Sequence, residues 1–168
     1  MVNNNMEAVE SIRERYHPER IKTLFVGESA PYSGDFFYYG DNAMLRNMRR
    51  AVELALGESG DFLESFKAYG WFLDDLVREP VNQLTKSQRK AKCLAAQKSL
   101  ADRIAVDKPE AIVSLLIFIK PYVDAAAIIA GSNAPRYVVP FPGMGQQARF
   151  QAAMAAIIPK LPRLTLPA

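Results

Sequence analysis

Residues 21–40 read IKTLFVGESAPYSGDFFYYG, and this stretch decides the fold. Residues 22–27 include contiguous apolar side chains, which are typical of a strand covered on both faces. The strand runs directly into a loop, residues 28–41, that combines small, acidic and aromatic residues. In α/β proteins, ligands bind at the carboxyl ends of buried strands. Glycines, carboxylates and flat rings at such a place favour a planar ligand, for example a nucleobase.

Segments with helical and strand patterns alternate along the rest of the chain. We expect further strands over 71–73, 110–116 and 136–139, and helices over 5–17, 42–56, 60–69, 87–106, 118–130 and 146–158. Strands separated by helices predict an α/β fold, a three-layer α/β/α sandwich with a four-stranded parallel sheet. Right-handed crossovers would bring the strand-to-helix loops to one edge of that sheet. We therefore expect one crevice lined by the loops at 28–41, 74–86, 116–118 and 140–145.

Length and composition predict an ordinary globular protein. A chain of 168 residues predicts one domain over 1–168, with an N-terminal helix within 1–19 and a tail over 160–168. The hydrophobic content of 49% and charged content of 23% are common values. A formal net charge of +3 permits a polyanionic partner but does not require one.

Several classes of site and location are disfavoured. The lone Cys93 excludes an internal disulfide and any cysteine-ligated zinc or iron–sulfur cluster, and His17 as the only histidine excludes a histidine-rich metal site. We therefore expect no metal and no cofactor. No apolar run approaches the ~20 residues of a membrane span, and residues 1–5 do not resemble a secretory signal. A cytoplasmic protein that does not enter membranes is expected; the sequence does not indicate its oligomeric state.

Three loops together resemble those of the uracil-DNA glycosylase superfamily. The stretch 27–31, GESAP, is similar to the family's motif at a strand end, and 36–40, FFYYG, resembles the segment whose Phe stacks on the base. The stretch 72–78, FLDDLVR, is similar to the strand ending in a base-reading Asn, and 140–143, PFPG, falls where the family has a His-Pro pair. The resemblance covers about residues 20–160. It implies a uracil-DNA glycosylase-like fold, DNA as the partner, and hydrolytic release of a base.

The chain departs from the family pattern at three positions. Phe141 stands where a catalytic His is expected, and a phenyl ring has no donor to stabilise an anion developing on the base. Asp75 stands where the base-reading Asn is expected. An ionised carboxylate only accepts hydrogen bonds, so it would repel a uracil carbonyl and favour a base bearing an amino group. Ser29 lies near where some members have a water-activating Asp, and Ser is a poor base on its own.

The candidate site residues fall into three groups. Glu28 and Asp35 are the candidate catalytic carboxylates, which would activate water or stabilise an oxocarbenium sugar. The candidate base-binding residues are Phe36, Phe37, Tyr38, Asp75 and Phe141. The amino end of the last helix attracts anions, so the candidate phosphate-binding residues are Gly143, Gly145, Gln146 and Arg149.

Each group also has a purely structural interpretation. Glu28 could bond a neighbouring backbone, Asp35 could be a turn carboxylate, and Asp75 could join Asp74 in pairing with Arg78. The glycines at 143 and 145 could form only a tight turn. Two other functions therefore stay open beside DNA base hydrolysis: a catalytically inactive nucleic-acid-binding protein of the same fold, and an enzyme acting on free nucleosides or nucleotides.

Overall fold

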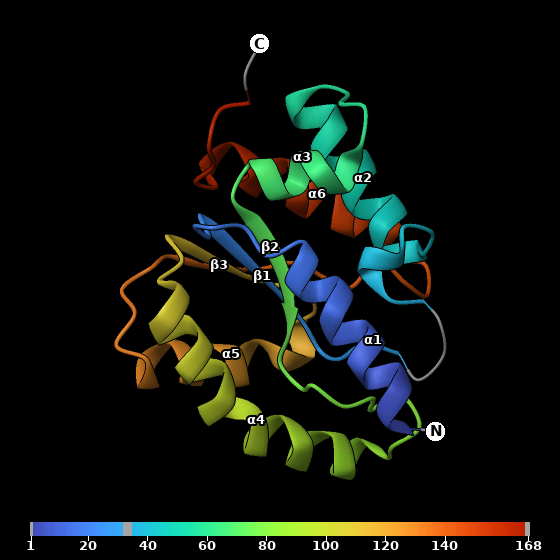
Figure 1. Cartoon of the computed structure of the whole chain (residues 1–168), viewed down its shortest axis with the longest axis vertical. Coiled ribbons are helices and arrows are strands. Elements are labelled where there is room, and N and C mark those ends of the chain that lie inside the picture. The colour runs from blue at the N-terminus through green and yellow to red at the C-terminus, as the bar shows by residue number, and fades with distance from the viewer. Residues whose placement is uncertain (1, 32–34, 167–168) are drawn as a thin grey trace.

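The computed structural model describes residues 2–31 and 35–166, with side chains from residue 6 onward (Figure 1). The strands are β1 (Thr23–Gly27), β2 (Trp71–Asp75), β3 (Ala111–Ser114) and β4 (Arg136–Val138). The α-helices are α1 (Val2–Arg15), α2 (Ala43–Leu56), α3 (Phe62–Ala68), α4 (Lys86–Asp107), α5 (Lys120–Ile129) and α6 (Gln147–Ile157). Short 3₁₀ helices are η1 (Phe37–Tyr39), η2 (Ile117–Ile119) and η3 (Ile158–Lys160).

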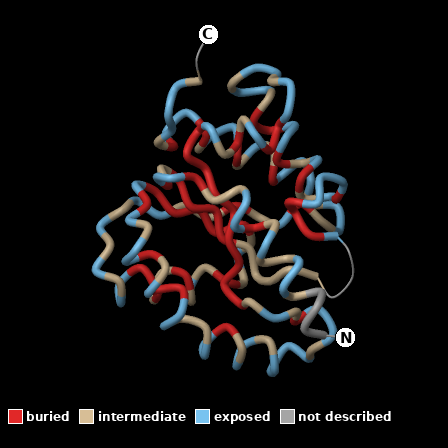
Figure 2. The backbone as a smooth tube through the Cα atoms, viewed as in Figure 1, coloured by how far each residue is buried: buried red, intermediate tan, exposed pale blue. Residues whose placement is uncertain are grey.

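The four strands form one parallel sheet in the order β2-β1-β3-β4. Helices α2, α3 and α6 lie over one face of the sheet and α4 and α5 over the other, while α1 lies beside β2 (Figure 1). The predicted α/β fold with a four-stranded parallel sheet is confirmed, and the arrangement is consistent with three layers. Burial is concentrated in β1, β2 and β3 and in the inward faces of the helices (Figure 2), whereas no residue of β4 is fully buried.

Three helices, α2, α3 and α4, begin at capping side chains that are visible in the sequence. Asn42 caps α2 by accepting from the Leu45 N–H, and Asp61 caps α3 by accepting from the Glu64 N–H. Helix α4 begins one residue earlier than expected, because Thr85 and Gln88 form a reciprocal capping box. The expected end of α2 at Gly57 is also found, with φ of 92° at that glycine.

Strand β2 is longer than its sequence suggested. Asp74 and Asp75, which we expected in a loop, continue the strand, pair with β1 and are 2% and 4% exposed. Two adjacent carboxylates are a poor strand signal, since ionised groups are costly to bury without partners. Here arginines from other elements supply those partners, as described below.

Side chains occupy the outer edge of β2. The Tyr38 hydroxyl donates to the Leu73 carbonyl oxygen at 2.9 Å and accepts from the Leu73 N–H at 2.7 Å. The Asp75 N–H donates to Asp74 Oδ1 at 2.7 Å, and Arg103 Nη2 donates to the Asp75 carbonyl oxygen at 2.8 Å. The outward-facing backbone groups of Leu73 and Asp75 therefore have hydrogen-bond partners, although no strand lies on that side of β2.

We predict that Asn42→Ala lowers the free energy of unfolding by about 2–4 kcal/mol. The substitution removes a helix cap and also two donors, since Asn42 Nδ2 bonds the buried carbonyls of Phe36 at 2.9 Å and Phe37 at 3.1 Å. Urea denaturation would measure the loss. The control is Asp61→Ala, an exposed cap expected to cost only about 1 kcal/mol. Equal losses in the two variants would contradict the additional role of Asn42.

Candidate functional site

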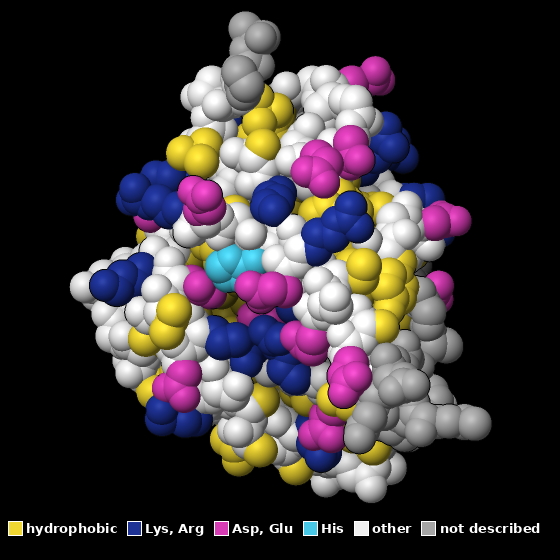
Figure 3. All heavy atoms as spheres, viewed as in Figure 1, with side chains coloured by type: hydrophobic (Ala, Val, Ile, Leu, Met, Phe, Trp, Pro, Cys, Tyr) yellow, Lys and Arg dark blue, Asp and Glu magenta, His cyan; other side chains and the backbone are white. Residues whose placement is uncertain are grey.

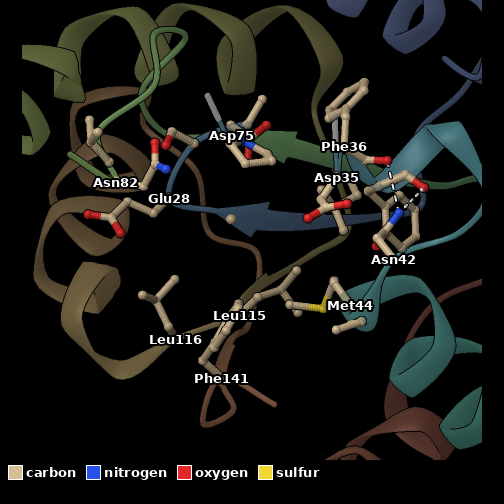
Figure 4. A pocket seen from close by; sticks show the side chains of 18 of the residues that line it. Glu28, Asp35, Phe36, Asn42, Met44, Asp75, Asn82, Leu115, Leu116 and Phe141 are labelled. Atoms are coloured by element: carbon tan, nitrogen blue, oxygen red, sulfur yellow. Dashed lines mark hydrogen bonds between the residues drawn. The ribbon is translucent and has the colours of Figure 1, made fainter. Parts of the chain in front are cut away.

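A cavity of about 580 Å³ opens where the carboxyl ends of β1, β2 and β3 meet (Figure 4). Glu28 and Phe141 come from the connections after β1 and β4, Asp75 is the last residue of β2, and all three line the cavity. The predicted convergence of these loops is therefore found. A volume in this range is suited to a small organic ligand.

Aromatic and aliphatic side chains form most of the cavity wall. Phe36 and Phe37 both line the cavity, and Phe141, Leu115 and Leu116 lie together in a part of the wall away from Phe36 (Figure 4). Phe36 and Phe37 are 3% and 5% exposed, whereas Phe141 is 50% exposed. The hydrogen bonds from Asn42 to the carbonyls of Phe36 and Phe37 hold the backbone of that wall. The cavity wall is thus largely apolar and includes three aromatic side chains, of which Phe141 is the most exposed.

The remaining predicted base-binding and phosphate-binding residues lie outside the cavity lining. Tyr38 is buried and bonds β2, as described above. Gly143, Gly145, Gln146 and Arg149 form the turn before α6 and its first residues. A Cβ at Gly143 would lie 2.8 Å from the Phe141 ring, and Gly145 has φ of 80°, so both glycines are explained by the turn itself. Phosphate binding by this segment stays a prediction.

The two candidate catalytic carboxylates have different surroundings. Glu28 accepts two hydrogen bonds from Arg89, from Nε at 2.9 Å and Nη2 at 2.7 Å, and the same guanidinium lies 4.6 Å from the centroid of the Phe118 ring. Both Glu28 oxygens are therefore engaged. Asp35 is exposed, and its carboxylate makes no ion pair or hydrogen bond within the described residues. It lies across the cavity from Glu28 (Figure 4). Of the two, Asp35 is the carboxylate free to take a proton from water.

Asp75 belongs to a buried charge network, which comprises Glu10, Arg13, Asp74, Asp75, Arg78 and Arg103. Arg13, 2% exposed, reaches from α1 and donates to Asp75 Oδ2 from Nη2 at 2.6 Å. Asp74 is bonded by Arg78 at 2.9 Å and by Arg103 at 2.8 Å. Glu10 bonds both Arg13 and Arg78. The structural interpretation, in which Asp74 pairs with Arg78, is confirmed for that pair.

The position of the Asp75 carboxylate is tightly constrained. A Cβ on Gly27 would lie 2.8 Å from Asp75 Oδ1, so the glycine at the end of β1 makes room for that oxygen. Burial raises the pKa of Asp75 to about 6, although the Arg13 charge acts in the opposite direction. At neutral pH the side chain is therefore mostly ionised and acts as a hydrogen-bond acceptor at the cavity wall.

Arg13 is the functional residue that the sequence analysis missed. Its guanidinium contacts two cavity residues from behind: it bonds Asp75 and lies 5.0 Å from the centroid of the Phe36 ring. The sequence does indicate that Arg13 is buried. It is four residues after Val9 and three before Tyr16, so it shares the inward face of α1. A charged residue on such a face requires a buried partner.

A second cavity, of about 320 Å³, lies between α1, β2 and α4 and is lined mainly by charged residues, among them Glu14, Asp102 and Asp107. His17 lines this cavity, with Nε2 3.4 Å from Asp107 Oδ1, and lies outside the first cavity. Within residues 2–31 and 35–166, no cluster of three or more His, Cys, Asp or Glu side chains is placed to hold a metal ion. In the same part of the chain, no helix is both long and apolar enough to cross a bilayer.

The chain matches no protein-family model, and a search of curated proteins finds no significant match.

We predict that Arg13→Gln moves the titration midpoint of Asp75 above about 6. The Arg13 charge lowers the pKa of Asp75, so its removal leaves burial and the neighbouring Asp74 to stabilise the protonated form. Carboxyl ¹³C chemical shifts followed against pH would measure the midpoint in both proteins. Arg78→Gln is the matched control, because Arg78 bonds Asp74 rather than Asp75 and has a weaker effect. A midpoint that is lower or unchanged in Arg13→Gln would contradict this account of the network.

Proposed function

We propose that this protein is a uracil-DNA glycosylase-like domain whose first cavity takes a nucleobase and that it hydrolyses the N-glycosidic bond of a modified base in DNA. The observation that supports this most directly is the combination of aromatic side chains in the cavity lining with a fixed carboxylate at the end of the sheet. Phe36, Phe37 and Phe141 can face a planar ring, and Asp75 can accept from its edge. The four-stranded parallel sheet and the loop order agree with the sequence resemblance.

In this proposal Asp75 selects the base. The carboxylate is held by Arg13 at 2.6 Å and is mostly ionised at neutral pH, so it accepts hydrogen bonds and does not donate them. A carbonyl oxygen facing it would be repelled, whereas an amino group would be bound. A site built to bond one polar group discriminates strongly against a ligand that lacks it. We therefore expect an amino-bearing base to be preferred over uracil.

Asp35 is the proposed catalytic carboxylate. Hydrolysis needs a group that accepts a proton from the attacking water or stabilises the positive charge on the sugar. Glu28 is already bonded through both oxygens to Arg89, whereas Asp35 is exposed at the cavity. Glu28 is then assigned to holding α4 against the loop after β1.

An exposed apolar side chain supports a nucleic-acid substrate. Met144 is fully exposed and has φ of 52°, unusual for a residue other than glycine, between Gly143 and Gly145. It is three residues from Phe141, which lines the cavity. Apolar side chains of this kind insert between base steps, and an enzyme that acts on an extruded base must stabilise the opened stack.

The negative charge of the cavity lining favours a second candidate function, that of an enzyme acting on a free nucleoside. Glu28, Asp35 and Asp75 are acidic, and Arg89 is the one cation among the described lining residues. On the face shown in Figure 3, basic and acidic side chains are interspersed rather than gathered into a continuous basic stripe. A polyanion gains little attraction from such a surface.

We predict that Asp35→Asn reduces base release by about 10²–10⁴-fold while leaving thermal stability unchanged, because the carboxylate is exposed and makes no ion pair or hydrogen bond with the described residues. The assay would use single-stranded and duplex oligonucleotides carrying uracil, hypoxanthine, xanthine or alkylated bases. Asp41→Asn is the matched control, since Asp41 is an exposed carboxylate of the same loop outside the cavity. If the parent protein binds DNA in a salt-sensitive manner but forms no abasic product, it is an inactive binder.

A thermal-shift comparison would separate the two candidate substrates. If DNA is the substrate, oligonucleotides should raise the melting temperature more than nucleosides at equal concentration, and Met144→Ala should weaken only the oligonucleotide effect. Stabilisation by nucleosides alone, unaffected by Met144→Ala, would reject the DNA substrate and support the free-nucleoside enzyme. The exposed Leu54, outside the cavity lining, provides the control variant Leu54→Ala.

A further inference from the structure

The ionisable side chains of the first cavity carry an excess of negative charge. Its described lining holds three carboxylates, those of Glu28, Asp35 and Asp75, and one guanidinium, that of Arg89. Arg89 is occupied by both oxygens of Glu28. Asp75 is paired with Arg13 behind the cavity wall, so among the described lining residues Asp35 is the one carboxylate without an ion-pair partner.

The apolar part of the wall is also suited to a cation. Phe36, Phe37 and Phe141 all line the cavity, and the face of an aromatic ring attracts positive charge. Phe36 already makes such a contact on its buried side, where the Arg13 guanidinium lies 5.0 Å from the ring centroid. Aromatic rings combined with carboxylates form the usual recognition surface for organic cations.

Few side chains of this cavity can donate a hydrogen bond to an anion: besides Asn42 and Arg89, the described lining holds only the Ser29 hydroxyl and the Asn82 amide. Phe141 offers no hydrogen bond, and the Asn42 amide N–H groups are donated to the carbonyls of Phe36 and Phe37. The Arg89 charge is neutralised by Glu28. A neutral base leaves its sugar as an anion, which enzymes normally stabilise with donors placed for that purpose. A positively charged base leaves as a neutral molecule and needs no such donors.

We infer that the cavity takes a positively charged, N-alkylated nucleobase; this inference rests on the proposed function and names its substrate class. The reaction is balanced without another reactant. The bond between the ring nitrogen and sugar C1′ breaks, and its electron pair passes to the ring nitrogen, which neutralises the base. The oxygen of water bonds to C1′, and its proton passes to the Asp35 carboxylate. Asp75 binds the amino group of the base during this step.

Two methyladenosines that differ in the position of the methyl group, and as a result in charge, provide the test. 1-Methyladenosine is a cation at neutral pH, whereas N6-methyladenosine is its neutral isomer. Isothermal titration calorimetry at pH 7.5 should show the cation binding about tenfold or more tightly, which corresponds to one cation–π contact together with attraction to the carboxylates. In the activity assay, oligonucleotides carrying 7-methylguanine should release base faster than those carrying hypoxanthine.

Variants connect the preference to the named side chains. Asp35→Asn and Asp75→Asn should each reduce the cation preference, while Asp41→Asn, outside the cavity, should leave it unchanged. Asp35 is exposed, so its variant remains informative even if Asp75→Asn is destabilised. Equal binding of the two isomers, or a preference that survives both variants, would overturn the inference while leaving a nucleobase site intact. Absence of binding by either nucleoside, together with no base release, would instead reject the proposed function.

Discussion

The rest of the structure depends on how two adjacent carboxylates are buried at the end of β2. Asp74 and Asp75 are almost inaccessible, and burying an ionised carboxylate without a partner costs several kcal/mol. The arginines that compensate them come from three places: Arg13 from α1, Arg78 from the connection after β2, and Arg103 from α4. Electrostatics thereby fixes the position of α1 against the sheet and presents one carboxylate to the cavity.

The coarse architecture could be predicted from the sequence because it depends on local signals. Apolar runs marked the strands, and Asn42, Asp61 and Gly57 marked helix ends through interactions within a few residues. The buried charge network could not be predicted in the same way. Arg13 and Asp75 are 62 positions apart, and only the folded arrangement shows that each is the partner of the other. The two acidic residues therefore resembled a polar loop.

In the candidate site, too, the sequence predicted the arrangement of the segments but not the contacts of the individual side chains. The meeting of Glu28, Asp75 and Phe141 at one cavity followed from parallel topology alone, without knowledge of side-chain contacts. The roles of individual residues depended on contacts that the sequence does not contain. Glu28 and Asp35 look equivalent in the sequence, but Arg89 engages only Glu28. Tyr38 looks like part of an aromatic clamp, but its hydroxyl bonds β2.

The bonding of Tyr38 to Leu73 has a consequence for assembly. A bare outermost strand is a template on which a second polypeptide can extend the sheet, a common route to unwanted association. At Leu73 both positions that an incoming strand would use are already filled by one phenol group, and at Asp75 they are filled by Asp74 and Arg103. Another chain could add along β2 only after displacing these side chains, so this border of the sheet is protected against strand addition.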